Sequence, residues 1–422
     1  MSLALTAYRY ATIALAPAVP FALAHRARRG KEDALRVRER LGYASAVRPA
    51  GELIWIHGAS VGESLSVLPL IKALVEGPGR TVLVSSGTVS SANLIAERLP
   101  ARAVHQYAPV DTPAAIRRFL DHWRPNVALF VDSEIWPNTI LSAHARGIPL
   151  GLINGRMSQR SFLAWQRLRK AAATLLSHYD ICFAQDSATA DRLTALGAKR
   201  VIVSGNLKAD APPLPVDQHK RAELRDAVGN RPILLAASTH AGEEETILPA
   251  HDRLRQTFPD LLTIIAPRHP DRGNDIAMLS GVRPAVRRSR GEFPSRDTAV
   301  YVADTLGELG TLYSLAPFTF VGGSLVPHGG QNPLEPAQLE RGVLAGPHTQ
   351  NFATAYNAIF AAQGAGRVGS SLELAGIAER LLRNPSDAIE MGKAAARGAQ
   401  TLGGAVHRTL HAVETLLSHA RA

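Results

Sequence analysis

Cysteine is nearly absent from this 422-residue sequence, and aromatic residues are few. The single thiol, Cys182, excludes a disulfide framework and any zinc site built from several thiolates, which is typical of a reducing compartment. Aromatic residues make up 5% of the chain, and no basic stretch is interleaved with them as a base-stacking surface requires. The sequence also lacks HExxH and closely spaced His/Cys sets, so we expect neither a nucleic-acid partner nor a metal centre.

Negative charge is in deficit. The chain has 47 Lys and Arg residues against 36 Asp and Glu, which gives a formal charge of +11. Such an excess predicts an acidic partner, either a phosphorylated substrate or an anionic membrane surface. With 46% hydrophobic and 20% charged residues, a chain of this length is typical of a globular protein with two domains.

Long apolar runs are confined to the N-terminus. The stretch from Leu3 to Ala24 is mostly apolar, but Pro17 and Pro20 interrupt it, which leaves a marginal length for a span of about 20 residues. Residues 25–40 then hold seven Arg or Lys residues against three acids. This order predicts that residues 1–40 associate with a membrane, and a buried N-terminal helix is the alternative. We expect residues 1–24 to contribute little to either core.

From residue 52 onward, short apolar runs alternate with amphipathic segments. This rhythm predicts parallel sheets in an α/β fold. The expected strands are Leu53–Ile56, Thr81–Val84, Val127–Val131, Pro149–Ile153, Ile181–Ala184, Val201–Val203, Ile233–Ala236, Leu261–Ala266, Ala299–Val302, Phe318–Val321 and Gly342–Leu344. A proline-rich stretch at residues 211–215 breaks the rhythm as a linker does. We therefore predict two α/β domains, residues 41–211 and 212–422, that face an interdomain cleft, with the last helix as a candidate to pack back on the first domain.

The stretch GGSLVPHGGQNPLEPA, residues 322–337, follows the apolar run Phe318–Val321. A strand that leads into Gly322 and Gly323 lets the backbone approach a ligand, and Asn332-Pro333-Leu334-Glu335 is typical of a helix start. A strand, a glycine loop and a helix N-terminus in this order favour an anionic or nucleotide ligand. A plain turn followed by a helix capped by Asn332 is the competing interpretation.

Three charged residues of the first domain are candidates for chemistry. Glu63 follows the first strand, although Ser60-x-x-Glu63 also has the spacing of a capping box. Glu134 lies at an apolar strand end beside Trp136, where capping explains it poorly and burial would raise its pKa if it were unpaired. Lys208 follows a strand and can neutralise charge on a leaving phosphate.

The second domain carries candidates for nucleotide binding. Arg268 leaves a strand and can grip a phosphate, and Glu335 can accept hydrogen bonds from ribose hydroxyls. Thr305-Leu306-Gly307-Glu308 combines a glycine turn with an acid, although it also has capping-box spacing. This division predicts a nucleotide in the C-terminal half and an acceptor in the N-terminal half.

Taken together, the motifs resemble those of the 3-deoxy-D-manno-octulosonic acid (Kdo) transferases along nearly the whole chain. The stretches that carry the resemblance are HGASVGE (57–63), SEIWPN (133–138), NGRMSQRS (154–161), GNLKAD (205–210), AASTHAGEEE (236–245), APRHPDR (266–272), VADTLGEL (302–309) and residues 322–337. The resemblance implies a GT-B glycosyltransferase with two Rossmann-like domains that transfers Kdo from CMP-Kdo to the lipid A precursor, lipid IVA, in lipopolysaccharide biosynthesis. It also implies an inverting, metal-independent reaction at the cytoplasmic face of the inner membrane.

Roles for individual residues follow from the same resemblance. Glu63 matches the general base, and Glu134 and Lys208 match residues that support the transition state. The CMP group is then held by Pro267, Arg268, Leu306, Gly307, Glu308, Asn332, Pro333, Leu334 and Glu335. The alternatives are another GT-B nucleotide-sugar enzyme, of the lipid A disaccharide synthase or sugar epimerase type, and a non-catalytic membrane-binding protein.

Overall fold

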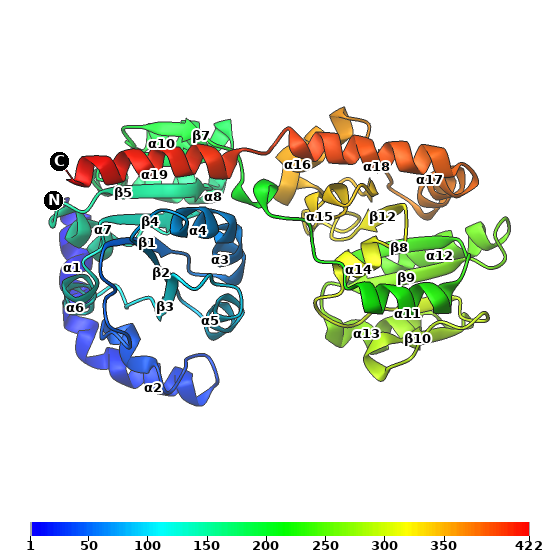
Figure 1. Cartoon of the computed structure of the whole chain (residues 1–422), viewed down its shortest axis with the longest axis horizontal. Helices are drawn as coiled ribbons and strands as arrows, with labels where there is room; N and C mark the ends of the chain where they lie inside the picture. The colour runs from blue at the N-terminus through cyan, green and yellow to red at the C-terminus, as the bar shows by residue number, and fades with distance from the viewer. Residues whose placement is uncertain (1, 422) are drawn as a thin grey trace. The chain divides into compact units, whose positions relative to one another are not determined.

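The computed structural model describes residues 2–421, which form two compact units (Figure 1). The first unit comprises the chain up to residue 211 together with the chain from residue 403, and the second comprises residues 212–402. The first boundary falls in the proline-rich stretch.

The first unit is built on a parallel sheet of seven strands in the order β3-β2-β1-β4-β5-β6-β7. Its strands are β1 (Glu52–His57), β2 (Arg80–Ser86), β3 (Ala103–Tyr107), β4 (Val127–Val131), β5 (Leu150–Gly155), β6 (Ile181–Ala184) and β7 (Val201–Val203). The six strands expected here from the sequence are present. β3 was missed because it is an edge strand with a mixed sequence, AVHQY, whose first three residues are only half-buried.

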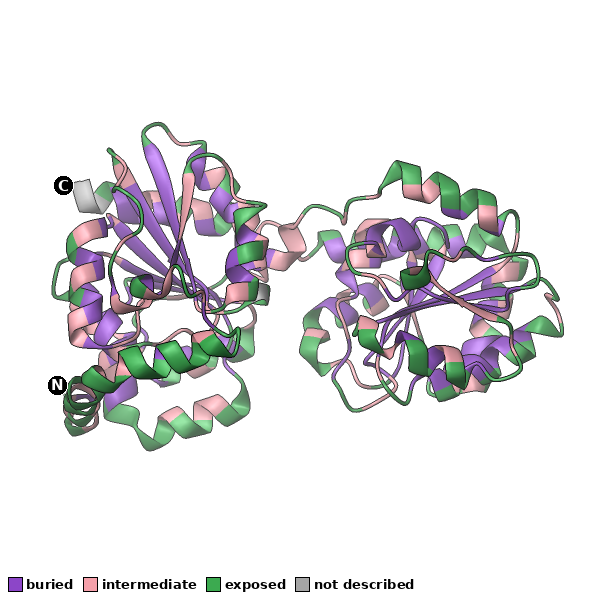
Figure 2. Cartoon of the chain, turned by 90° about the horizontal axis from the view of Figure 1, so that it is seen from below, coloured by how far each residue is buried: buried purple, intermediate pink, exposed green. Residues whose placement is uncertain are grey.

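Helices of the first unit connect and cover these strands. They are α1 (Leu3–Leu15), α2 (Val19–Arg28), α3 (Val61–Ser66), α4 (Leu68–Val75), α5 (Val89–Ala96), α6 (Pro113–Trp123), α7 (Pro137–His144), α8 (Gln159–Arg167), α9 (Arg169–Leu176), α10 (Ser187–Ala195) and α19 (Ala405–Arg421). Short 3₁₀ turns are η1 (Ala16–Ala18), η2 (Val37–Leu41) and η3 (Leu207–Asp210). In Figure 2 the strands are buried and the exposed residues lie on the helices and loops around them.

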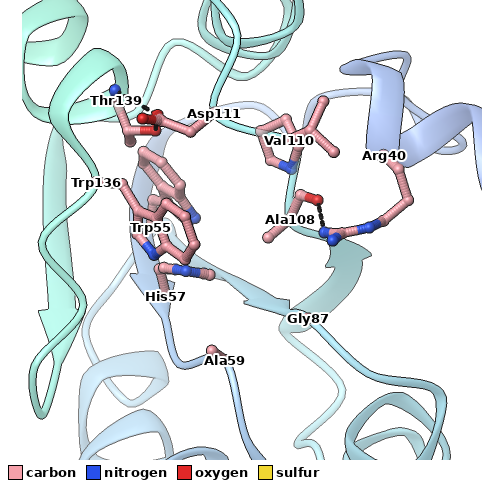
Figure 3. A pocket seen from close by; sticks show the side chains of 11 residues that line it. Arg40, Trp55, His57, Ala59, Gly87, Ala108, Val110, Asp111, Trp136 and Thr139 are labelled. Carbon is pink, nitrogen blue, oxygen red and sulfur yellow. Dashed lines mark hydrogen bonds between the residues drawn. The ribbon is translucent and has the colours of Figure 1, made fainter. Parts of the chain in front are cut away.

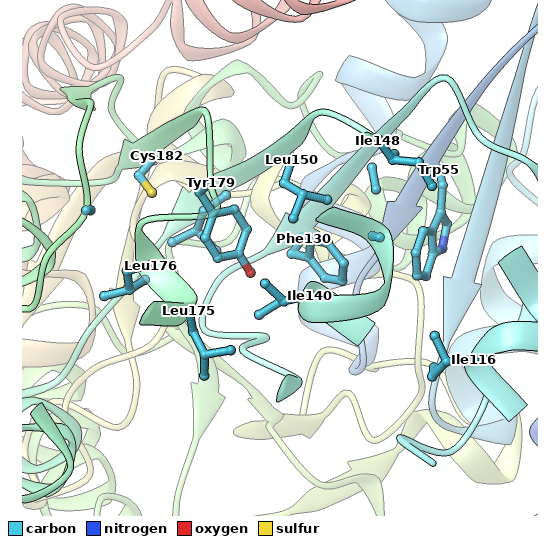
Figure 4. Packing of buried hydrophobic residues seen from close by; sticks show 14 of the residues in the cluster. Trp55, Ile116, Phe130, Ile140, Ile148, Leu150, Leu175, Leu176, Tyr179 and Cys182 are labelled. Carbon is cyan, nitrogen blue, oxygen red and sulfur yellow. The ribbon is translucent and has the colours of Figure 1, made fainter. Parts of the chain in front are cut away.

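The hydrophobic core of the first unit lies on both faces of its sheet. One face holds large aromatic side chains, including Phe130 and Tyr179, whose rings meet edge to face with centroids 6.0 Å apart. Cys182 is fully buried beside them (Figure 4), and burial raises the pKa of its thiol to about 12. The thiol is therefore a small core residue and not a reactive one.

The N-terminal segment contributes Leu5 to this core, while most of residues 2–24 are half-buried or exposed. Leu5 of α1 is 3% exposed and packs in the cluster that includes Ile116 and Phe119 of α6. The hydroxyl of Tyr8 donates to Asp111 (2.9 Å) and ties α1 to the sheet's loops. The prolines divide the apolar run into α1, η1 and α2 as expected, and no helix within residues 2–421 is long and apolar enough to cross a membrane.

The second unit repeats the architecture with a parallel sheet in the order β10-β11-β9-β8-β12-β13-β14. Its strands are β8 (Ile233–Thr239), β9 (Leu262–Pro267), β10 (Ala285–Arg287), β11 (Val300–Val302), β12 (Phe318–Val321), β13 (Gly342–Ala345) and β14 (Ala365–Arg367). Its helices are α11 (Gln218–Val228), α12 (Glu244–Arg255), α13 (Gly273–Leu279), α14 (Leu309–Tyr313), α15 (Leu334–Gln338), α16 (Ala353–Ala361), α17 (Ser371–Arg383) and α18 (Pro385–Gln400). Short 3₁₀ turns are η4 (Pro270–Arg272), η5 (Arg288–Arg290) and η6 (Gln350–Phe352).

The last helix, α19, packs on the first unit (Figure 1). Its apolar face, with Val413, Leu416 and Leu417, belongs to the second core cluster of that unit. Arg80 of β2 forms a two-pronged ion pair with Glu414 of α19 and a further one with Glu52 of β1 (2.8 Å). These contacts fix the C-terminal segment on a sheet formed from the first half of the chain.

We predict that Leu5→Ala lowers the free energy of unfolding of the first unit by about 2–5 kcal/mol, because it leaves a cavity in a packed core. Leu3→Ala in the same helix is the matched control, since Leu3 is 91% exposed, and it should change stability by less than about 0.5 kcal/mol. All four tryptophans lie in the first unit, so denaturant unfolding followed by tryptophan fluorescence reports on that unit alone. Equal effects of the two substitutions would contradict a core role for α1.

Candidate active site

Each sheet has one point where the strand order reverses. In the first unit β1 and β4 are neighbours, and in the second unit β8 and β12 are neighbours. Connections from such neighbours leave in opposite directions, which opens a crevice at the carboxyl ends of the strands. The polar motifs of the sequence follow these strands, and each unit therefore has a candidate ligand site at its own switch point.

Glu63 lies in the first turn of α3, just after β1. Its two carboxylate oxygens accept hydrogen bonds from the Ala59 N–H (2.8 Å) and the Ser60 hydroxyl (2.6 Å). Ser60 Oγ in turn accepts the Glu63 N–H (3.3 Å), so the capping interaction predicted from the spacing is present. Because each carboxylate oxygen has a second lone pair, Glu63 can cap the helix and still accept a proton.

Glu134 follows β4 and is paired. His57 Nε2 lies 3.3 Å from its carboxylate, and the indole N–H of Trp136 donates to the same oxygen. Burial acts to raise the pKa of Glu134, but the hydrogen bonds from His57 and Trp136 outweigh it and lower the pKa. The raised pKa that an unpaired acid would have is therefore not found here.

His57 is held in place from its other side. Trp55 Nε1 donates to Ser85 Oγ (2.8 Å), and Ser85 Oγ lies 3.0 Å from His57 Nδ1. Because the carboxylate of Glu134 can only accept a hydrogen bond, the proton of the neutral His57 ring lies on Nε2, and Nδ1 accepts the hydroxyl proton of Ser85.

Asp132 is the acid that the sequence pattern did not single out. It follows β4 directly, with a left-handed φ of 62°, and its buried Oδ1 has no hydrogen-bond partner. Burial raises its pKa to about 6, Glu63 and Glu134 add to the rise, and Arg156 and Lys208 act against it. An acid with this environment is able to change charge near neutral pH. An acid immediately after a fully apolar strand was the signal that could have identified it.

Lys208 reaches the same region from η3. An added Cβ on Gly62 would lie 3.9 Å from its Nζ, which places the ammonium beside the first turn of α3, which carries Glu63. The side chain of Asn154 at the end of β5 accepts the Leu207 N–H (2.9 Å) and so fixes the start of η3. The three catalytic candidates from the sequence thus lie around Asp132 in one unit.

A pocket of about 200 Å³ opens beside these residues (Figure 3). Its lining includes both partners of Glu134, His57 and Trp136, together with Ala59, whose N–H binds Glu63. Arg40, Trp55, Gly87, Ala108, Pro109, Val110, Asp111 and Thr139 complete it. The pocket is mainly apolar with a few fixed polar groups, which is typical of a small-molecule site.

The glycine loop of the second unit differs from the sequence-based expectation. The carboxylate of Glu243 is fully buried and accepts four backbone N–H groups, from His240 (2.8 Å), Gly323 (2.6 Å), Ser324 (3.0 Å) and Leu325 (3.0 Å). The amides that were expected to approach a ligand are thus already bound to a carboxylate of the protein itself.

Gly322 also has a structural reason to be glycine. A Cβ at this position would lie 2.3 Å from the carbonyl oxygen of Ser238 at the end of β8. The glycine therefore allows β8 and β12 to pack closely, which is a structural need separate from the ligand approach expected from the sequence.

Several of the residues expected to bind the nucleotide group follow β9 and β11. Pro267 ends β9, and the side chain of Arg268 is exposed. Leu306 and Gly307 form an exposed turn in which Gly307 has a φ of 82°. Because the side chain of Arg268 is exposed, its guanidinium is available to an anionic ligand.

Glu308 is bound by basic side chains. It pairs with Lys220 (2.9 Å) and Arg288 (3.1 Å) and accepts the hydroxyl of Thr305. Burial acts to raise the pKa of Glu308, but these hydrogen bonds outweigh it and hold the pKa at about 2. Its carboxylate is therefore ionised and held in one position at neutral pH.

Asn332, Pro333, Leu334 and Glu335 form the start of a short helix, α15, of five residues. The helix begins at Leu334 with Pro333 in the capping position, one residue later than expected. Asn332 nevertheless caps it, because its Oδ1 accepts the Leu334 N–H (3.1 Å) and its Nδ2 donates to Glu335 (3.2 Å). Within residues 2–421, no group of three or more His, Cys, Asp or Glu residues is placed to hold a metal ion.

Known proteins match the chain along most of its length. A family profile described as "3-Deoxy-D-manno-octulosonic-acid transferase (kdotransferase)" matches residues 35–211. The probable mitochondrial 3-deoxy-D-manno-octulosonic acid transferase of Arabidopsis thaliana is 37% identical over 392 residues, which cover 90% of this chain and 88% of that protein. The 3-deoxy-D-manno-octulosonic acid transferase of Bordetella pertussis is 33% identical over 425 residues, 97% of this chain and 99% of that one. A solved glycosyltransferase from Rickettsia africae ESF-5 has a TM-score of 0.61 at 12% identity, with 87% of this chain and 99% of that chain covered.

Two Rossmann-like units, each with its own parallel seven-stranded sheet, form the GT-B fold. The fold class predicted from the sequence is thereby confirmed. The identity to its relatives extends through both units, and the chain belongs to the 3-deoxy-D-manno-octulosonic acid transferase family. The predicted family is confirmed as well.

We predict that Asp132→Asn stabilises the first unit by about 1–3 kcal/mol at pH 8 and has no stabilising effect at pH 4. The folded-state pKa of about 6 lies above that of an unfolded aspartate, so ionisation costs folding free energy as the pH rises from about 4 to 6. Asparagine also tolerates the left-handed backbone, so the substitution removes the charge without adding strain. The measurement is urea unfolding at several pH values, with Asp121→Asn at an exposed position as the control. The same pH dependence of stability in both variants would contradict the raised pKa of Asp132.

Proposed function

We propose that the protein transfers Kdo from CMP-Kdo to a hydroxyl group of the lipid A precursor lipid IVA in lipopolysaccharide biosynthesis. The observation that carries this proposal is the 37% identity over 90% of the chain to a Kdo transferase. The switch-point site of the first unit supports it, because a carboxylate, a buried acid and an ammonium group lie together there. The reaction inverts the anomeric centre and uses Glu63 as general base.

Glu63 is suited to take the proton of the acceptor hydroxyl. Its carboxylate is fixed by two short hydrogen bonds, from Ala59 and Ser60, and stands at the strand end beside the pocket. As the acceptor oxygen bonds to the anomeric carbon, its proton passes to Glu63 and the bond from that carbon to the CMP phosphate breaks. A base positioned in this way contributes about 100- to 10,000-fold to the rate.

The other charged groups act on the charge that develops. Lys208 supplies positive charge as the phosphate leaves. Asp132, when ionised, adds negative potential next to Glu63. Glu134 holds His57 and Trp136 at the wall of the pocket and thus shapes the place that an acceptor occupies.

We predict that Glu63→Gln reduces turnover by at least about 100-fold while stability changes by less than about 1 kcal/mol. The amide oxygen of glutamine can accept the Ala59 N–H and its nitrogen can donate to Ser60 Oγ, so the cap survives. Glutamine cannot accept the proton of the acceptor. Steady-state rates with CMP-Kdo and lipid IVA, together with thermal unfolding, separate the two roles.

Ser60→Ala is the matched control for that experiment. It removes the cap and keeps the carboxylate, so stability should fall by about 1 kcal/mol while most turnover remains. If Glu63→Gln were as active as Ser60→Ala, Glu63 would be a capping residue only. The next carboxylates to examine would then be Glu134 and Asp132.

For the donor site we propose that CMP binds the second unit through Pro267, Arg268, Leu306, Gly307, Glu308 and residues 332–335, without a metal cofactor. The guanidinium of Arg268 can balance the phosphate charge.

We predict that CMP inhibits the reaction, that UDP at the same concentration inhibits at least about 10-fold less, and that both results persist in excess EDTA. Equal inhibition by UDP would favour an epimerase-type or disaccharide synthase-type donor, and loss of activity that only a divalent ion restores would refute metal independence. The product mass reports whether Kdo has been added to the lipid.

A membrane surface is proposed as the place of action, at the cytoplasmic face of the inner membrane. Large apolar side chains of the N-terminal segment are exposed, with Phe21 at 79% and Leu35 at 96%, next to the basic residues of positions 26–40.

We predict that Phe21→Glu with Leu35→Glu weakens flotation with anionic vesicles by at least about 10-fold. Val282→Glu, at a 98% exposed position of the second unit, is the control and should leave flotation unchanged. Equal flotation of the double variant and the Val282→Glu control would refute membrane binding through Phe21 and Leu35.

A further inference from the structure

Three histidines gather at the switch point of the second unit. His240 follows β8, His269 follows β9, and His328 lies in the loop after β12. The rings of His240 and His328 have centroids 3.9 Å apart, and that of His269 lies 5.9 Å from His240. Neighbouring strand ends therefore bring together residues that are far apart in the sequence.

Basic side chains lie close to this histidine cluster, His240 with His269 and His328. Arg268 and Arg272 stand close enough to act on His240. Two nearby acids are bound to other groups, because Glu243 accepts four backbone amides and Glu244 pairs with Arg272 (2.7 Å).

Neither Glu243 nor Glu244 is paired with any of the three rings. The side-chain amide of Gln331 donates to His240 Nε2 (2.8 Å), which leaves the ring proton of neutral His240 on Nδ1.

Electrostatics agrees with this arrangement. Burial, followed by His328, His269 and the two arginines, lowers the pKa of His240 to about 4. An anion that binds among these basic groups reduces the electrostatic repulsion between them. Two of the rings, those of His269 and His328, are exposed and can meet a ligand directly.

We infer that the histidine cluster is the subsite for the carboxylate of the donor sugar. This inference rests on the proposed function, in which the transferred group is an octulosonic acid. Its anomeric carbon carries a carboxylate, a group that CMP alone lacks. Imidazole N–H groups hold such a carboxylate by charge-assisted hydrogen bonds without a permanent positive charge at the reacting carbon.

The test compares two ligands on the full chain, CMP and CMP-Kdo, by isothermal titration calorimetry. His328→Gln and His240→Asn should each weaken CMP-Kdo binding by about 10-fold or more, the range for a lost hydrogen bond to a charged group, and change CMP binding less than about 2-fold. His219→Gln is the matched control, because His219 on α11 of the same unit has an 85% exposed side chain. It should alter neither affinity.

The pH dependence gives a second readout that a purely structural role would not produce. A bound carboxylate raises the pKa of the rings, so CMP-Kdo binding takes up protons and tightens as the pH falls from 8 to 6. We expect the ratio of CMP to CMP-Kdo dissociation constants to rise about 3-fold or more over this range. The combined His240→Asn and His328→Gln variant should lose this rise.

The outcomes separate the two ideas. If the unmodified chain binds neither ligand, the proposed function fails and this inference with it. If all variants bind CMP-Kdo like the unmodified chain, the inference fails and the proposed function stands. If the substitutions weaken the binding of CMP and CMP-Kdo equally, the histidines serve nucleotide binding or the fold, which also overturns the inference. Because His328 is exposed, its substitution remains informative even if His240→Asn does not fold.

Discussion

Parallel strand pairing is the constraint on which the rest of this structure depends. It directs the carboxyl ends of seven strands to one edge of each sheet, so residues that are distant in the sequence become neighbours without any further instruction. Three non-glycine residues adopt a left-handed backbone at such strand ends, Asp132, Asn154 and Ser238. Strained backbone of this kind concentrates at functional sites. Asp132 is the first residue after β4, and Asn154 and Ser238 lie where the register of β5 and β8 shifts.

Most of the carboxylates that a reader of the sequence would suspect of chemistry are bound within the protein. Glu134 is held by His57 and Trp136, Glu243 by backbone amides, and Glu308 by basic side chains. Such bonds favour the ionised form of an acid and hold it in one position, and for Glu243 burial outweighs them and raises the pKa. Asp132 is different because one of its oxygens is buried without a partner. The contrast separates acids that shape a site from one whose charge can change there.

The sequence was sufficient for the central strands and for only one edge strand. All eleven expected runs are strands. Ten of them are central strands, which are buried on both faces in a parallel sheet and read as continuous apolar segments, and the eleventh is the edge strand β7. The missed strands β3, β10 and β14 are outermost in their sheets, and the last two have three residues each. The motif order placed the site residues at the right strand ends. What it could not supply was the partner of each polar group. The amides of the glycine loop look available in the sequence, and only the fold reveals that Glu243 occupies them.

The docking of α19 has a consequence for how the protein is made. The first sheet is synthesised by residue 203, yet the helix that covers part of it lies more than 200 residues later in the chain. During translation, the guanidinium of Arg80 lacks its partner on α19 until the last segment leaves the ribosome. The apolar groups that Val413 and Leu417 cover stay exposed for the same time. The second unit, in contrast, is continuous in sequence and can close while its predecessor is still incomplete. The half of the protein that is translated first is therefore the half that finishes folding last.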